Sequence, residues 1–351
     1  MNNEKKFLDL AMHHIQRREY GKAKEIYFKL IEDGSKNHLI FGDLAIIYGI
    51  EGNLERMYKF LLEAIKIEPN YPDAHNNLGF YYTKKGDYES AIKSYKNALK
   101  LNPYLSDSYY NLGVIFADIG NFKESIKCYK KVIEINPKYF YAYYNLGLVY
   151  KELDEVNNSL NSFYLALQIN PKSSETYNNL GIIFLNQNNI QKAIKYFQKS
   201  IINKFDNYES LNNLGIAYER TGNYDKSIFH LKQALKYNNN YPEAFFNLAN
   251  VQKASGKIHE SVLSYASALR IKPNYQEALF NYSLALFLTN RYQEAWDAFE
   301  SRFDNGFVIP HVTTTNLIRW RGEKLDNDEK LLIVSEQGLG DTIQFMRYIP
   351  H

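Results

Sequence analysis

The sequence lacks several features that define common classes of protein. It has one cysteine, Cys128, in 351 residues, which excludes an internal disulfide framework and favours a reducing compartment such as the cytoplasm. No stretch approaches the roughly 18 consecutive apolar residues that a membrane-spanning helix needs. The opening MNNEKKFLDLAMHHIQRREY is charged throughout and holds no apolar core of signal-peptide length. We therefore expect a cytoplasmic protein without a membrane span.

A strong excess of charge is also missing. The chain has 42 Lys and Arg against 39 Asp and Glu, a formal net charge of +3, which gives no basic field of the kind that binds nucleic acid. The histidines are scattered without cysteine partners at metal-ligand spacing, and no Ser/His/Asp or Cys/His group stands out. Before residue 304 the sequence therefore predicts no catalytic site, no metal site and no cofactor.

What the sequence does contain is a period of 34 residues. The stretches NNLGFYY, YNLGVIF, YNLGLVY, NNLGIIF and NNLGIAY begin at residues 76, 110, 144, 178 and 212, with no insertion or deletion between them. Internal repeats of this length are typical of stacked helical units. The glycine in each stretch marks the eighth position of a repeat: Gly79, Gly113, Gly147, Gly181 and Gly215.

Three further positions recur with the same period. A turn residue occupies position 15, a small Ala or Ser occupies position 20, and proline occupies position 32 in many repeats. Apolar residues lie at helical spacing on either side of the turn, which predicts two short antiparallel helices per repeat. Small residues let the two helices pack closely, and proline ends the second one. Because one helix pair cannot bury its apolar face, each repeat needs its neighbours.

These residues resemble the tetratricopeptide repeat, with Leu, Gly and Tyr in the first helix, Ala and Phe in the second, and then Pro. The resemblance implies an all-α, right-handed superhelical solenoid of about nine helix-turn-helix units over residues 1–303, starting near residues 4, 38, 72, 106, 140, 174, 208, 242 and 276. It also implies a scaffold that binds protein or extended peptide in a concave groove lined by the first helices.

Two positions of the first helix are candidates for that groove. Position six is asparagine in seven consecutive units, which resembles the asparagine ladder of O-linked N-acetylglucosamine transferase. A row of amides can pair with a peptide backbone, or it can satisfy local backbone groups instead. Position five carries aromatic residues that either anchor a peptide or pack on the next helix. The candidates are Asn77, Asn111, Asn145, Asn179, Asn213, Asn247 and Asn281, with Tyr110, Tyr144, Phe246 and Phe280.

The charges near these positions narrow the class of partner. Position two is mostly acidic, as in Asp73, Asp107 and Glu243, and the favoured explanation is that carboxylates suit the first turn of a helix. Some three-repeat modules of this family bind acidic chaperone tails with basic residues at positions two, five and six. None of those positions is basic in the seven asparagine-bearing units, so we do not expect a chaperone-tail clamp.

The last part of the chain departs from the repeat pattern. Residues 304–329 are predicted to form a linker, and residues 330–351, KLLIVSEQGLGDTIQFMRYIPH, to form a strand, a glycine turn and the start of a helix. A single strand cannot form a domain by itself. We therefore expect that the chain stops at the beginning of a truncated α/β domain.

The same stretch resembles bacterial proteins that join tetratricopeptide repeats to a heptosyltransferase-like glycosyltransferase domain. The resemblance implies that Gly338 and Gly340 approach the substrate and that Asp341 is the base in a longer, nucleotide-sugar-dependent parent. Asp341 also fits a simple helix cap. We expect the chain itself to be inactive. Three functions stay open at this point: the recruiting region of a glycosyltransferase, the transferase itself in a full-length parent, and a free-standing adaptor.

Overall fold

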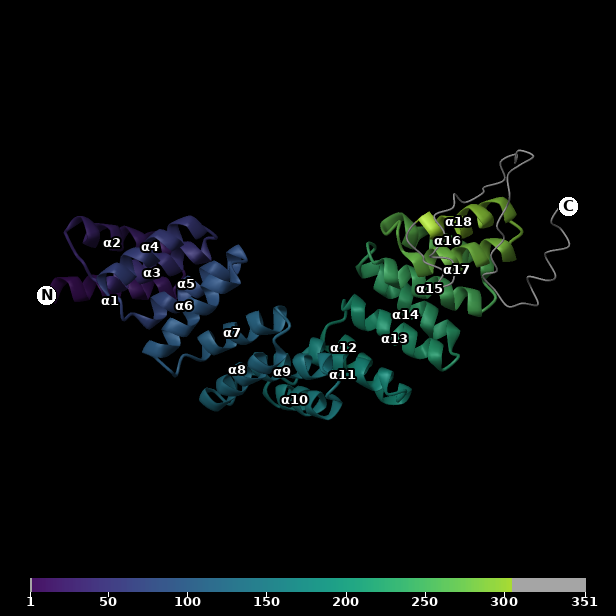
Figure 1. Ribbon diagram of the computed structural model, residues 1–351, viewed down its shortest axis with the longest axis horizontal. Coiled ribbons are helices and arrows are strands. Elements are labelled where there is room, and N and C mark those ends of the chain that lie inside the picture. The colour runs from purple at the N-terminus through teal and green to yellow at the C-terminus, as the bar shows by residue number, and fades with distance from the viewer. Residues whose placement is uncertain (1, 305–351) are drawn as a thin grey trace, which may run out of the picture. The chain divides into compact units, whose positions relative to one another are not determined.

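The structure is a computed structural model that describes residues 2–304 as eighteen helices (Figure 1). That part of the chain contains no strand, so the predicted all-α class is confirmed for it. The last helix extends to Asp304, the first residue of the predicted linker. The rest of the linker and the predicted strand–turn–helix, with Gly338, Gly340 and Asp341, lie outside the described residues.

The chain divides into two compact units between Gln187 and Asn188. The first unit contains α1 (Asn2–Gln16), α2 (Tyr20–Glu32), α3 (His38–Ile50), α4 (Leu54–Ile67), α5 (Pro72–Lys85), α6 (Tyr88–Leu101), α7 (Ser106–Asp118), α8 (Phe122–Ile135), α9 (Phe140–Glu152), α10 (Val156–Ile169) and α11 (Ser174–Asn186). The second contains α12 (Ile190–Asn203), α13 (Tyr208–Arg220), α14 (Tyr224–Tyr237), α15 (Pro242–Ala254), α16 (Ile258–Ile271), α17 (Gln276–Leu288) and α18 (Tyr292–Asp304).

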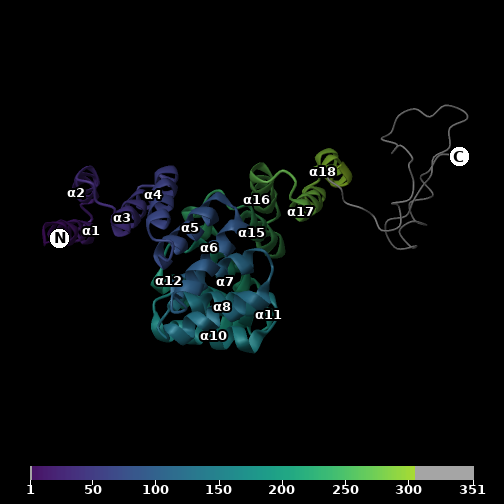
Figure 2. The ribbon, with the colours of Figure 1, turned by 60° about the vertical axis from the view of Figure 1, so that its left-hand side comes forward.

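Within each unit the helices form hairpins that stack in chain order. The odd-numbered helices are here called A helices and the even-numbered ones B helices. Inside a unit, an A helix packs on the B helix that follows it, and that B helix packs on the next A helix. Figure 1 and Figure 2 both show α1 and α2 beside α3 and α4. Consecutive A helices also contact one another, as α5–α7 and α7–α9 do in the first unit and α13–α15 and α15–α17 in the second. They thereby form a shared surface, the A-helix face.

The turn inside each hairpin depends on one left-handed residue. Position 15 has a φ between 57° and 80° in all nine repeats of the described region, where glycine is the least strained residue. The next residue is often Asn or Asp, and its side chain accepts a hydrogen bond from the backbone at the start of the B helix, as Asp87 does from Ser90 N. The left-handed residues are Arg18, Gly52, Gly86, Gly120, Asp154, Asn188, Gly222, Gly256 and Asn290.

The core of a hairpin is an aromatic ring packed on a glycine. Tyr129 of α8 is almost fully buried, and a Cβ atom on Gly113 of α7 would lie 2.6 Å from its ring. The small residue at position 20, here Ser125, donates a hydrogen bond of 2.7 Å to the carbonyl oxygen of Gly113. This close approach explains why the sequence repeats a glycine and a small residue twelve positions apart. Among the described residues no helix is long and apolar enough to cross a membrane.

Candidate functional site

The predicted groove residues all lie on A helices, one asparagine on each from α5 to α17. Because position five directly precedes position six, the aromatic candidates lie beside the asparagines on α7, α9, α15 and α17. The A-helix face thus collects the predicted residues within each compact unit.

Several asparagines connect neighbouring repeats by hydrogen bonds. In the first unit the Nδ2 atoms of Asn145 and Asn179 donate to the hydroxyl oxygens of Tyr110 and Tyr144 over 3.2 and 3.3 Å. In the second unit Asn247 Nδ2 donates to Asn212 Oδ1 over 2.9 Å. Each bond runs from position six to position five of the preceding repeat. These amides therefore help to fix the spacing of the A helices.

Two lysines, not predicted as site residues, bind the oxygens of this row. Lys151 Nζ donates to Asn179 Oδ1 over 3.1 Å, and Lys253 Nζ donates to Asn281 Oδ1 over 2.7 Å. Asn179 also donates to the Glu175 carbonyl oxygen, so both of its N–H groups have partners within the chain. Both lysines occupy position 12, where most repeats have an uncharged residue. That difference was the signal in the sequence that could have identified them.

The asparagines nearest the middle of the first unit retain more capacity for a ligand. The side chain of Asn111 makes no hydrogen bond with any described residue. Asn77 Oδ1 accepts one bond of 3.3 Å, from the neighbouring Asn76. Both side chains are partly exposed. The row therefore contains members with free hydrogen-bonding groups as well as members already bonded within the chain.

The aromatic residues at position five pack on the aromatic core of their own hairpin. The ring centroids of Tyr110 and Tyr129 lie 6.1 Å apart, and the same distance separates Phe246 from Tyr265. The pairs Tyr144–Phe163 and Phe280–Phe299 repeat this contact at 5.9 and 6.2 Å. Phe280 nevertheless stays 44% exposed. Packing and surface exposure thus coexist at this position.

Tyrosines at the last position of a repeat extend the aromatic surface and were not predicted. The ring centroids of Tyr139 and Tyr110 lie 5.3 Å apart, and those of Tyr275 and Phe246 lie 5.1 Å apart. Burial, followed by the negative charge of Asp107, raises the pKa of Tyr139 to about 12, and its hydroxyl donates to Asp107 Oδ1 over 3.4 Å. At least this position-two carboxylate therefore already has a partner within the chain.

The second unit also carries two half-buried charges on its A helices. Burial raises the pKa of Glu219 and lowers the pKa of Lys253, because it disfavours the charged form of both. The carboxylate of Glu219 has no hydrogen bond or ion pair with any described residue. Lys253 Nζ donates to the Asn281 amide oxygen and lies 5.8 Å from the centroid of the Tyr265 ring. It forms no ion pair with a carboxylate among the described residues.

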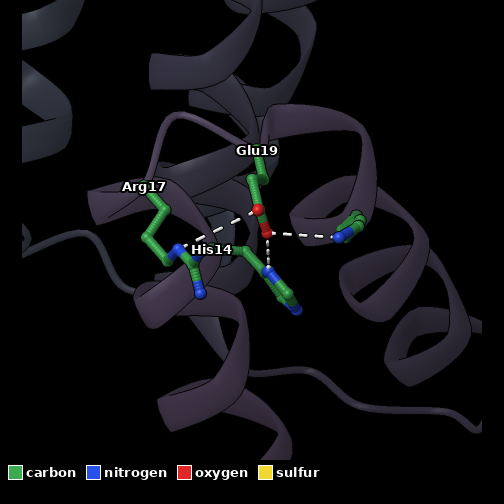
Figure 3. A network of polar contacts seen from close by, with 4 residues as sticks. His14, Arg17 and Glu19 are labelled. Atoms are coloured by element: carbon green, nitrogen blue, oxygen red, sulfur yellow. Dashed lines mark hydrogen bonds and ion pairs between the residues drawn. The ribbon is translucent and has the colours of Figure 1, made fainter.

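A polar cluster at the N-terminal end has a structural role. Glu19, which precedes α2, accepts a 2.6 Å hydrogen bond from His14 Nδ1 of α1 and lies 3.9 Å from Arg17 Nε (Figure 3). The hydrogen bond from His14 is the main cause that lowers the pKa of Glu19. The cluster joins α1 to α2, and the described residues contain no group of three His, Cys, Asp or Glu side chains able to hold a metal.

Comparison with known families agrees with the hairpin stack. Family models described as TPR repeat or tetratricopeptide repeat match residues 40–71, 60–93, 81–120, 115–154, 140–173, 174–203, 220–256 and 246–305. Together they span most of the two compact units. The chain therefore belongs to the tetratricopeptide-repeat family.

Individual relatives match over limited regions. Protein FlbA of Caulobacter vibrioides is 38% identical over 71 residues, a match that covers 18% of this chain and 11% of FlbA. Most of the length of FlbA therefore has no counterpart in this match.

Solved structures with the same fold cover more of the chain. The crystal structure of the APC/C hetero-tetramer Cut9–Hcn1 matches 75% of this chain and 52% of that chain, with a TM-score of 0.56 and 19% identity. A TPR repeat-containing protein from Cytophaga hutchinsonii matches 69% of this chain and 99% of that chain, with a TM-score of 0.56 and 20% identity. At these identities the likeness concerns the fold alone.

Proposed function

We propose that the A-helix faces bind extended peptide segments of partner proteins and that the repeats serve as a non-catalytic scaffold. The observation that carries this proposal is the row of partly exposed apolar and amide side chains on successive A helices, held by hydrogen bonds between repeats. Phe80 and Phe280 are 37% and 44% exposed. Side chains that are already ordered lose little conformational entropy on binding.

An extended peptide suits this surface better than a compact small molecule. Its backbone offers a donor and an acceptor at each residue, which the free amide groups of Asn111 and Asn77 can use. Its side chains reach the aromatic residues at position five, and aromatic contacts dominate many interfaces. Two shallow, polar hollows of the described region lie elsewhere, at turns between helices, such as the one lined by Gly222, Asn223 and Ser255.

A peptide selection with a matched pair of variants tests the proposal. Peptides are selected from a random displayed library on the full chain, and their affinities are measured by fluorescence anisotropy. Phe280→Glu, on the A helix α17, is expected to weaken binding at least tenfold. Phe229→Glu is the control, since Phe229 is 57% exposed on the B helix α14 of the same unit. Equal loss in both variants, or loss in Phe229→Glu alone, contradicts the proposal.

We further propose that partner recruitment serves a glycosyltransferase encoded with these repeats. The support is the sequence turn of Leu339, Gly340 and Asp341, which resembles that of heptosyltransferases. We expect its partners in the cytoplasm, because the single cysteine Cys128 is a free, buried thiol. Sequencing of the source DNA beyond the codon for His351 tests the transferase: an immediate stop codon, or sugar transfer by residues 1–351 alone, contradicts it.

A further inference from the structure

Position 12 of the A helices carries an unusual pair of opposite charges in the second unit. Glu219 of α13 and Lys253 of α15 occupy this position in consecutive repeats. Apart from Lys151, every other repeat has an uncharged residue there: Ile15, Gly49, Thr83, Ala117, Leu185 and Phe287. The pair is therefore a local feature of the second unit and not a property of the repeat.

Both charges lie near one buried tyrosine, Lys253 in contact with its ring and Glu219 close enough to act on it electrostatically. Tyr265 of α16 is fully buried, and its hydroxyl donates to Asn250 Oδ1 of α15 over 2.6 Å. Lys253 Nζ lies 5.8 Å from the centroid of its ring. Glu219 is near enough for its charge to add to burial in raising the pKa of Tyr265. The carboxylate and the ammonium group thus share one neighbourhood on the A-helix face.

Neither charge is neutralised within the described part of the chain. No ion pair joins Glu219 to Lys253, and neither has another ion-pair partner among the described residues. Asn281 supplies a neutral oxygen to Lys253, and Arg220 follows Glu219 directly along α13 and only partly offsets its charge. Half-buried charges without an oppositely charged partner are costly, so opposite charges on a ligand gain more from pairing here than on an exposed surface.

We propose that the A-helix face formed by α13, α15 and α17 binds an extended peptide that places a basic side chain against Glu219 and an acidic side chain against Lys253. This inference rests on the proposed function and names the class of peptide that the second unit selects. The exposed ring of Phe280 provides apolar contact beside the charges. Charge complementarity defines the ligand as a peptide with both a basic and an acidic side chain. A neutral or purely acidic peptide cannot pair with both Glu219 and Lys253.

The spacing of the two ligand charges follows from the geometry of the repeat. Packed helices lie about 8–10 Å apart, and an extended chain rises about 3.3 Å per residue. A basic and an acidic residue about three positions apart therefore match Glu219 and Lys253. Adjacent charges on the peptide match the two protein groups less well.

Synthetic peptides of equal length test the charge pattern on the full chain. Each labelled probe has a Ser, Ala and Leu background with one Arg and one Glu three residues apart, in either order, and binding is followed by anisotropy. Comparison probes replace Glu, Arg or both by Gln, or place the two charges side by side. We expect one order of the three-residue spacing to bind roughly tenfold tighter than the doubly neutral probe.

Variants of the protein assign that preference to the two side chains. Lys253→Met is expected to weaken the Arg–Glu probe about tenfold and to leave the doubly neutral probe unchanged. Glu219→Gln is expected to act only on probes that contain Arg. Lys232→Met is the matched control, because Lys232 is exposed on the B helix α14, and it is expected to change nothing.

Three results overturn the inference, and they separate it from the proposed function. Equal affinity for charged and neutral probes, with sensitivity to Phe280→Glu, leaves peptide binding intact and removes the charge preference. Failure of every probe to bind also removes the charge preference. The proposed function is then judged separately, by whether the library-selected peptides bind. Non-additive effects of Glu219→Gln and Lys253→Met on the unfolding of the free protein show that the two charges pair with each other instead.

Discussion

The hairpin α7–α8 in the first unit and the hairpin α15–α16 in the second are close counterparts with different surface chemistry. Both bury a tyrosine on the B helix, Tyr129 or Tyr265, and both place an aromatic ring of position five 6.1 Å from it. The glycine of the first hairpin, Gly113, is replaced in the second by Ala249. The same fold is thus built with and without the glycine.

The replacement changes the contact between the two helices. Ser125 donates to the carbonyl oxygen of Gly113, whereas Ser261, at the same position in the second hairpin, donates to the carbonyl oxygen of Ile258 within its own helix. The link through the serine hydroxyl is therefore present in α7–α8 and absent in α15–α16. In α7–α8 the glycine leaves room for the Tyr129 ring, which a Cβ atom at Gly113 would approach to 2.6 Å.

The connection to the following repeat also differs. Asn145 donates to the hydroxyl of Tyr110, but Phe246 has no oxygen to accept such a bond from Asn281. Asn281 is held instead by Lys253 over 2.7 Å. In the second unit a lysine ammonium group thus replaces the tyrosine hydroxyl as the hydrogen-bond partner of the asparagine. The repeats stay connected, and the A-helix face gains a positive charge.

The largest effect on stability is expected from adding a methyl group at Gly113, where the Tyr129 ring packs. In Gly113→Ala the new Cβ would lie 2.6 Å from the ring, so we expect a loss of about 2–3 kcal/mol in the free energy of unfolding. Alkylation of Cys128 on α8 reports local opening, since burial raises the pKa of its thiol to about 11 and slows the reaction. Gly21→Ala is the control, because a Cβ atom at Gly21 would have nothing within 4 Å. Equal stability of the two variants would falsify the packing argument.

The turns of the two hairpins should respond alike. Gly120 and Gly256 have φ values of 75° and 80°, and a side chain in this region costs about 1 kcal/mol. Gly120→Ala and Gly256→Ala are therefore each expected to lower the free energy of unfolding by about that amount, as measured by urea denaturation. Asp154→Gly, at a left-handed position occupied by aspartate, is expected to stabilise. A turn that tolerates alanine without loss contradicts this explanation of position 15.

A reciprocal exchange at position five tests the ties between repeats. Tyr110→Phe removes the acceptor of the 3.2 Å bond from Asn145, and we expect a loss of about 1 kcal/mol. Phe246→Tyr supplies an equivalent acceptor to Asn281 and is expected to stabilise by a smaller amount. Urea unfolding of both variants measures the difference. If both exchanges are neutral, the asparagine row does not connect the repeats energetically.

The smallest effect concerns Asp43, which replaces asparagine at position six of α3. Burial raises the pKa of Asp43 above its ordinary value of 3.8, although the 2.5 Å hydrogen bond from the Tyr27 hydroxyl opposes the shift. Because the pKa of Asp43 is higher in the folded than in the unfolded chain, the protonated carboxyl contributes to the free energy of unfolding. This contribution is fully present below pH 3.8 and is lost as the pH rises through the raised pKa. Asp43→Asn should therefore gain stability relative to the unmodified chain as the pH rises. Parallel pH profiles of unfolding would rule this out.

The sequence predicted the helical class and the position of each turn because these depend on local periodicity and on residues such as Gly120 and Gly256. It also placed the asparagines and the position-five aromatics on the first helix of each repeat. It could not show that Lys151 and Lys253 bind amide oxygens of the next repeat, or that the ring of Tyr139 packs against that of Tyr110. Those contacts join residues about 28 or more positions apart, and their partners depend on how one hairpin sits on the next.

The central claim is that ligands bind on the A-helix face, and side-chain footprinting with and without a selected peptide tests it most directly. Phe280 on α17 and the B-helix residues Phe229 and Leu263 are 44%, 57% and 68% exposed, so all three are open to hydroxyl-radical labelling in the free protein. Binding is predicted to protect Phe280 and to leave Phe229 and Leu263 unchanged. Protection of Phe229 and Leu263, with Phe280 still labelled, contradicts the account.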